Sequence, residues 1–124
     1  MPASDYFTTE VDHAVFRPTG HVLLDEAVEM VAEAIALART QGATHLLVVT
    51  SGWTGIAPPA LTDRYDLAKR WAAEARSIVR VAVVAKPEMI DPQKFGVTVA
   101  RNRGMVTDVF IFEPEAIAWL RNGR

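Results

Sequence analysis

The chain has 124 residues, half of them hydrophobic, which is typical of one domain that buries its own core. Its 13 Lys and Arg residues against 15 Asp and Glu residues give a formal net charge of −2, which excludes both a strongly basic nucleic-acid-binding surface and an acidic disordered tail. The absence of cysteine excludes disulfides, thiolate-bound zinc, iron–sulfur clusters and a cysteine nucleophile.

The start of the chain lacks the features of a secretory signal. Residues 1–12 are polar and acidic, without a basic region followed by an apolar one. The longest aliphatic runs, 46–49 and 81–85, are far too short to cross a bilayer. We therefore expect a cytoplasmic protein with no transmembrane segment and no nucleic-acid partner.

The first predicted elements are a hairpin and a helix. Residues 6–11 and 14–16 have the character of two extended pieces joined by a tight turn, which predicts a hairpin at the edge of a sheet. Apolar residues then recur at three- and four-residue steps from Leu24 to Ala38, which predicts an amphipathic helix that ends just before Gly42.

Strands and helices alternate along the rest of the chain. Three short apolar runs rich in β-branched or aromatic residues predict strands fully covered by the rest of the protein, and each is followed by a helical pattern. The predicted strands are 45–49, 79–85 and 109–112. The predicted helices are 61–75, 91–103 (with Asp91 as N-cap and Pro92 in the first turn) and 114–122.

This alternation predicts an α/β fold with parallel strands and right-handed crossovers. We expect a mixed sheet of about five strands, the N-terminal hairpin being its antiparallel part, with four helices arranged two on each face. Residues 1–124 should form a single domain. Trp119 and Leu120 should be buried, because a terminal helix with little apolar contact would fray.

The common catalytic signatures are missing from the sequence. It contains no phosphate-binding GxxxxGK[ST], no GxGxxG, no HExxH and no GxSxG. His13, His21 and His45 fall on different predicted elements without the spacing of metal ligands. We therefore predict no metal site, no cofactor and no catalytic residue.

The loop 50–59 is the best candidate binding segment, because it leaves the carboxyl end of a parallel strand, where open α/β sheets place ligands. Gly52 and Gly55 have no side chain, so another group can approach the backbone closely there. Trp53 either folds back as a lid over the core or presents a stacking surface to a ligand. Ser51 is either a capping hydroxyl or a nucleophile or phosphoacceptor. Thr54 completes the candidate set in this loop.

The loop 86–91 follows the next parallel strand and should lie beside the loop 50–59. Lys86 would then either meet an anionic group of a ligand or remain a solvated lysine at the end of a strand. The predicted ligand-binding residues are Ser51, Gly52, Trp53, Thr54 and Lys86. The basic cluster 101–103 is not included in the predicted binding site, since it ends a predicted helix at the opposite edge of the sheet.

Three segments carry a family resemblance over nearly the whole chain. VRVAVVAK (79–86), FGVTVARNRG (95–104) and VFIFEPEAIAWL (109–120) resemble the STAS/SEC14-type SpoIIAA-like proteins of bacteria, which have the STAS, or anti-sigma-factor antagonist-like, fold. The resemblance implies a protein partner and pairing into a homodimer. In such antagonists a serine after the central strand is phosphorylated, and Ser51 is the corresponding candidate phosphosite, although Thr50 stands where they have an aspartate.

Together these observations favour a non-enzymatic regulatory or ligand-binding module of STAS-like type. It would act through protein contacts or through a small apolar, lipid-like or anionic ligand near the loop 50–59. The alternative is a small enzyme that uses the loops 50–59 and 86–91. An uneven charge distribution, acidic over 1–63 and basic over 64–103, is consistent with self-association.

Overall fold

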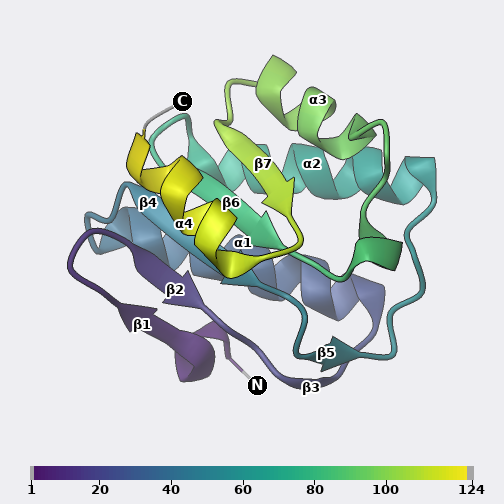
Figure 1. The fold of residues 1–124 in the computed structure, drawn as a ribbon, viewed down its shortest axis with the longest axis horizontal. Coiled ribbons are helices and arrows are strands. Elements are labelled where there is room, and N and C mark those ends of the chain that lie inside the picture. Colours follow the sequence, from purple (N-terminus) through teal and green to yellow (C-terminus); the bar gives the residue numbers. More distant parts are fainter. Residues whose placement is uncertain (1, 123–124) are drawn as a thin grey trace.

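The fold is built on a five-stranded sheet in the order β1-β2-β4-β6-β7 (Figure 1). A computed structural model describes residues 2–122. The sheet strands are β1 Phe7–Thr9, β2 Ala14–Phe16, β4 His45–Val49, β6 Arg80–Val84 and β7 Thr107–Phe110. The helices are α1 Leu24–Thr40, α2 Leu61–Ala75, α3 Phe95–Asn102 and α4 Glu113–Asn122, with short 3-10 helices η1 at Ala3–Tyr6 and η2 at Pro87–Met89.

Strand pairing agrees with the mixed sheet predicted from the sequence. β1 pairs antiparallel with β2 at one edge, and the remaining neighbours are all parallel. The central pair β4 and β6 is in register over five residues, from His45 opposite Arg80 to Val49 opposite Val84. Leu46 to Val49 are buried on both faces of the sheet, which explains why this run is continuously apolar.

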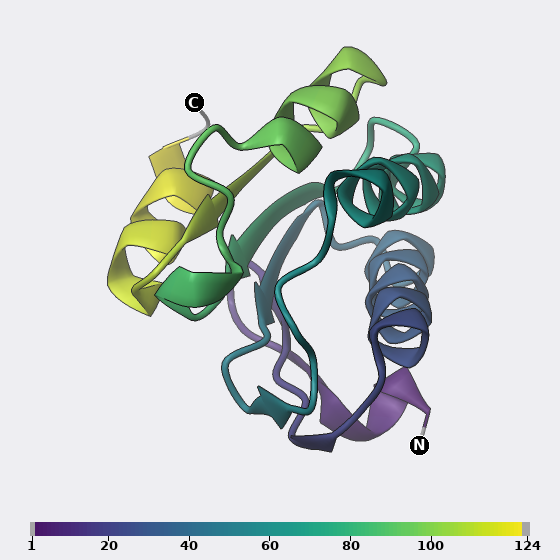
Figure 2. The same cartoon turned by 90° about the vertical axis from the view of Figure 1, so that its right-hand side faces the viewer.

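The helices are divided unequally between the two faces of the sheet (Figure 2). α1, α2 and α3 form one layer, and α4 packs on β4, β6 and β7 from the other side. The expected arrangement of two helices per face is therefore wrong. Each crossover moves one strand further in the same direction, so right-handed connections place all three crossover helices on one face, whereas α4 follows the last strand and is free to cover the other.

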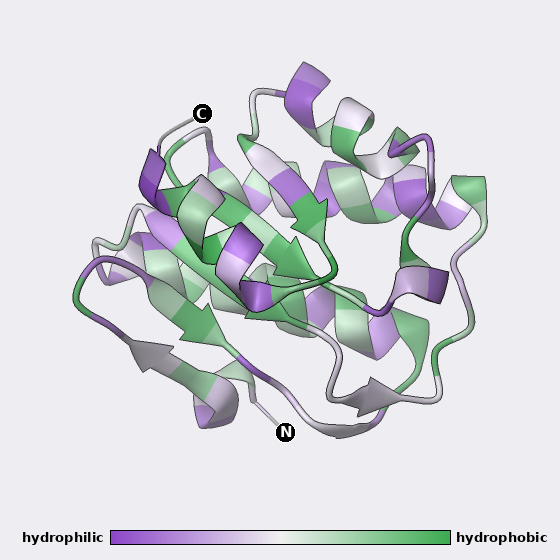
Figure 3. Cartoon of the chain, in the orientation of Figure 1, coloured by the Kyte–Doolittle hydropathy of each residue, from purple (hydrophilic) through white to green (hydrophobic). Residues whose placement is uncertain are grey.

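The sheet separates two apolar cores, and Figure 3 shows its central strands as hydrophobic over most of their length. On the α4 side, Leu120 is fully buried against Leu47 and Val84, as expected. Trp119 is only partly buried: its ring packs 5.8 Å from Phe110 and lies under the guanidinium of Arg80 at 4.9 Å. Trp119 is therefore less buried than the sequence predicted.

Two local features differ from the sequence prediction. α3 begins at Phe95, because Lys94 has a left-handed backbone (φ 52°) and the Asp91 carboxylate accepts the backbone N–H groups of Gln93 and Phe95 in a preceding turn. A second sheet, β3 Gly20–His21 paired with β5 Trp53–Thr54, was not predicted, since two-residue strands leave no periodic pattern. Among residues 2–122, no helix combines the length and apolar character that crossing a bilayer requires.

An ion pair fastens α4 to the opposite end of the chain. The guanidinium of Arg17, just after β2, donates two hydrogen bonds to the Glu113 carboxylate, one of them at 3.0 Å. These hydrogen bonds hold the pKa of Glu113 below its usual range. A lowered pKa in the folded state means that the pair stabilises the fold above the unfolded-state pKa and loses this effect as the pH falls through the folded-state pKa.

We therefore expect Glu113→Gln to lower the melting temperature at pH 7, and the difference from the parent protein to shrink between about pH 5 and pH 3. Thermal melts followed by circular dichroism measure this. Glu115→Gln, the same charge change at an exposed position of the same helix, is the matched control. A Glu113→Gln difference that is unchanged at pH 3 would contradict the assignment.

Candidate functional site

The loop after β4 turns back to the sheet instead of extending into solvent. The Thr50 hydroxyl donates to the Val84 carbonyl (3.0 Å), and the Trp53 backbone N–H donates to the Thr50 carbonyl (3.0 Å). Residues 53–54 then form β5 and pair with β3. This second pairing ties the loop to the connection between β2 and α1.

The glycines of this loop are needed for contacts within the chain. A Cβ at Gly52 would lie 2.7 Å from the Pro18 carbonyl oxygen, and one at Gly55 would lie 2.4 Å from the His21 ring. Gly55 also has a φ of +91°, which disfavours other residues. The close backbone approach expected here is thus an approach to the segment 18–21.

Trp53 is part of the core as well as of the loop. Its side chain is 5% exposed and meets Phe16 edge-on, with ring centroids 6.1 Å apart and planes at 74°. Its indole N–H is buried and has no hydrogen-bond acceptor within the described residues. Of the two interpretations of Trp53, the covering role agrees with this burial, and Trp53 is also among the residues that line the cavity described next.

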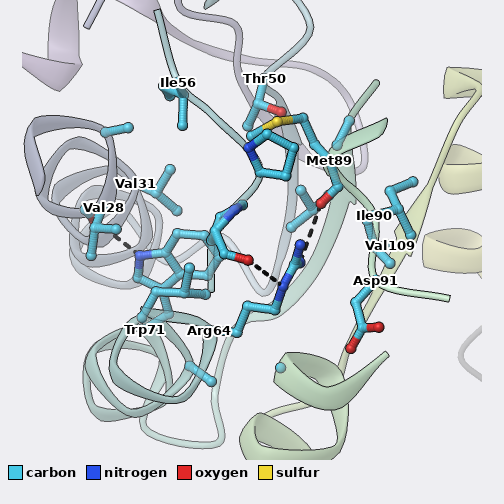
Figure 4. A pocket seen from close by; sticks show the side chains of 18 of the residues that line it. Val28, Val31, Thr50, Ile56, Arg64, Trp71, Met89, Ile90, Asp91 and Val109 are labelled. Atoms are coloured by element: carbon cyan, nitrogen blue, oxygen red, sulfur yellow. Dashed lines mark hydrogen bonds between the residues drawn. The ribbon is translucent and has the colours of Figure 1, made fainter. Parts of the chain in front are cut away.

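A cavity of about 340 Å³ lies between the sheet and the layer of three helices (Figure 4). Its walls come from α1, α2, α3, β6, β7, the loop 50–59 and the segment 86–91. Buried residues form its floor: Ala27, Val31, Trp53, Ala68, Ala85, Ala100, Met105 and Thr107. Exposed lining residues mark where it opens to solvent: Thr54, Gly55, Pro58, Glu88 and Lys94. Val109, which also lines the cavity, is half-buried.

Small side chains explain why this space is not filled. The helices present Ala27, Ala68, Gly96 and Ala100 to the cavity. α2 packs mainly on α1 and α3 and makes little contact with the strands, so it spans the gap above β6 and β7. The largest side chain that α2 contributes to the lining, Trp71, is held against α1, its indole N–H donating to the Val28 carbonyl at 2.9 Å.

Two of the cations that line the cavity donate hydrogen bonds to backbone carbonyls. The Lys86 ammonium donates to the Trp53 carbonyl at 3.3 Å, so the loops 50–59 and 86–91 flank each other as predicted. Arg64 of α2 donates to the Pro59 carbonyl (Nε, 3.1 Å) and the Met89 carbonyl (Nη1, 3.2 Å). Figure 4 shows Arg64 reaching from its helix toward Met89 across the cavity.

Two of the three carboxylates that line the cavity, Asp91 and Asp108, are engaged within the chain. Asp91 accepts the backbone N–H groups of Phe95 (2.9 Å) and Gln93 (3.1 Å), and these bonds, with a smaller effect of Arg64, hold the pKa of Asp91 below its usual range. Asp108 is paired with Lys94 at 2.8 Å. Both carboxylates therefore stabilise local structure at the cavity rim.

The structure divides the residues predicted to bind a ligand into two groups. Trp53, Thr54 and Lys86 line the cavity, whereas Ser51 and Gly52 are exposed on the turn outside it. Arg64 was not predicted, although a signal was present: it falls four residues before Ala68 and seven before Trp71, on the side of α2 that faces the cavity. A cation at such a position is uncommon unless it has a partner there.

Comparison with known proteins identifies the fold. No family model and no curated protein sequence matches the chain. Among solved structures it is similar to the anti-sigma factor antagonist SpoIIAA in its unphosphorylated form, at 18% identity over 93% of this chain and 97% of that chain, with a TM-score of 0.50. It is also similar to an uncharacterised DUF3478 family protein with a SpoIIAA-like fold from Shewanella loihica, at 19% identity over 92% and 89% of the two chains, with a TM-score of 0.49.

The chain thus has the α/β fold of the SpoIIAA class, with a mixed five-stranded sheet and four helices. This is the STAS-like fold that the sequence resemblance implied.

The burial of Trp53 leads to a prediction about stability. Trp53→Ala should lower the free energy of unfolding by about 3–5 kcal/mol, because it opens a void beside Phe16. Thr54→Ala, at the exposed neighbouring position, should stay within about 0.5 kcal/mol of the parent. Urea denaturation measures both. A loss below about 1 kcal/mol for Trp53→Ala would show that the ring contributes little to the core.

Proposed function

We propose that the protein is a non-enzymatic binding module that holds a small, largely apolar molecule in the cavity beneath the loop 50–59. The observation that carries this proposal is the cavity itself, at about 340 Å³. Pockets for small molecules usually measure about 300–1,000 Å³ and are mostly apolar with a few convergent polar groups. The position also fits, because the carboxyl edge of parallel strands is where open α/β sheets bind ligands.

The lining supports an apolar ligand over a polar one. Side chains such as Val28, Val31, Ile56 and Val109 face the space shown in Figure 4 and offer a ligand no hydrogen bonds. Burying a ligand's apolar surface there would contribute about 25 cal/mol for each Å² removed from water. The polar groups lie in the segments 50–54 and 86–91 and on α2, where they would orient one end of the ligand.

A ligand in this position would also give the protein a regulatory output. The cavity opens beside the exposed residues Thr54, Gly55 and Glu88. Occupation of the cavity would change the surface that these residues form, and a protein partner in contact with that surface would bind differently.

The chemistry of the rim favours binding over catalysis. An enzyme would need at least two convergent titratable groups poised for reaction. Asp91 caps the turn before α3, and Lys86 is bonded to a backbone carbonyl. Both side chains are therefore engaged in hydrogen bonds to the backbone of this chain.

Filling the cavity tests the proposal. Ala68→Leu extends a buried side chain of α2 into the space, so binding of decanol, an apolar probe, should weaken at least tenfold relative to the parent. Ala73→Leu, the same change at an exposed position of the same helix, should leave the affinity unchanged. Isothermal titration calorimetry gives both affinities, and melts check that each variant is folded. A folded Ala68→Leu variant with the parent's affinity would exclude the cavity as the site.

A second mode, regulation by phosphorylation, is favoured by the position of Ser51. This serine is exposed on the turn directly after β4, outside the cavity and accessible to a kinase. The similar solved protein is described in its unphosphorylated form, which supports a phosphorylated counterpart in that protein. We extend this role to Ser51 as a proposal.

A phosphate adds close to two negative charges, which Asp imitates in part. Ser51→Asp should therefore change the amount of a partner protein recovered in a quantitative pull-down, whereas Ser51→Ala should recover the same amount as the parent. Equal recovery with all three proteins would remove the phosphorylation mode and leave ligand binding unaffected.

A further inference from the structure

Some of the charged groups that line the cavity are paired with an opposite charge and others are not. Its lining contains three cations, Arg64, Lys86 and Lys94, and three carboxylates, Glu88, Asp91 and Asp108. Lys94 is paired with Asp108, and Asp91 is committed to backbone N–H groups. Arg64 and Lys86 have only neutral backbone carbonyls as hydrogen-bond partners within the described residues. Glu88 is exposed at the opening and forms no ion pair with Arg64 or Lys86, so these two cations remain without a bonded carboxylate among residues 2–122.

A third donor at the cavity is unsatisfied. The indole N–H of Trp53 is buried without an acceptor in the described part of the chain. Buried donors in native proteins almost always have a partner, and an orphan one points to a missing group. Trp53 is one of the residues that line the cavity, and its backbone carbonyl accepts the Lys86 ammonium. Three donor groups on lining residues, those of Arg64, Lys86 and Trp53, therefore have no bonded carboxylate in the described part of the chain.

The size of the cavity limits the ligand. A cavity of about 150 Å³ takes up benzene, so by the same packing a space of 340 Å³ takes up roughly 14 non-hydrogen atoms. Apolar residues of α1, α3 and β7 line much of the space, and Arg64 and Lys86 are the lining cations to which no carboxylate of the described residues is bonded. A fitting molecule has one acceptor-rich end and an apolar remainder.

The geometry points to an apolar monocarboxylate, of the size of a medium-chain fatty acid, with its carboxylate between Arg64 and Lys86. This inference rests on the proposed function and adds the chemical class of the ligand. Arg64 contributes most, since its planar guanidinium matches a carboxylate with two parallel hydrogen bonds. A carboxylate also carries a full negative charge, which the carbonyls of Pro59 and Met89 lack, so it competes well with them for the guanidinium.

The test compares probes that share one chain and differ in the head group. Decanoate, decanol and decylammonium are titrated into the parent protein by calorimetry, below their aggregation concentrations. We expect decanoate to bind at least tenfold more tightly than decanol, and decylammonium to bind most weakly. Equal binding of decanoate and decanol would overturn the carboxylate assignment and leave the proposed apolar site intact. No binding of any probe would overturn both.

Variants locate the head group. Arg64→Gln should reduce the preference for decanoate over decanol at least fivefold, and Lys86→Gln should have a smaller effect in the same direction. Lys69→Gln removes one positive charge from the exposed face of the same helix and should retain the preference. Two variants are used so that poor folding of one does not prevent the test. A preference retained in both Arg64→Gln and Lys86→Gln would overturn the assignment of these residues.

Discussion

Right-handed crossovers connect β2 to β4, β4 to β6 and β6 to β7 in one direction across the sheet, and the positions of all the other elements depend on this constraint. Three helices must share one face. α1 covers β2 and β4, α3 lies beside β7, and α2 is held between its two neighbours above the middle of the sheet. The opposite face needs only α4, whose buried Leu120 closes the second core.

The crowding of three helices on one face accounts for the cavity. α2 is held mainly by contacts with α1 and α3, and the residues it directs toward the sheet are small, such as Ala68. Close packing normally leaves few spaces larger than a water molecule, so a void of about 340 Å³ stands out among ordinary packing defects. A helix supported from its sides can remain above such a void without the large side chains that would otherwise fill it.

The loop 50–59 links stability to the candidate site. Trp53 is anchored in the core against Phe16, its backbone is paired in β5, and its carbonyl accepts the Lys86 ammonium. One residue thus fixes a wall of the cavity and the position of a cation at its rim. The wall is rigid where Trp53 is anchored, while exposed Thr54 and Gly55 lie next to the opening.

Most of the helices and strands, and the class of fold, were predictable from the amino-acid sequence. Apolar periodicity located α1 and α2, a buried run gave β4 over His45–Val49, and the alternation of strands and helices predicted the mixed sheet. It also indicated that the segments after β4 and β6 meet, because the carboxyl ends of parallel strands lie at one edge. The short β3–β5 pairing was beyond its reach, since two residues have no periodicity.

The distribution of helices over the two faces, the cavity and the contacts of Arg64 follow from tertiary packing, which the sequence pattern does not show. Periodicity shows which face of a helix is apolar but not how far that face stands from the sheet, so the void under α2 has no signature in the sequence. The same limit applies to Arg64 and Lys86, which are distant in the chain and line one cavity because α2 is held above β6 and β7 by its neighbours. Whether a cation has a partner is a property of that packing, and no local pattern records it.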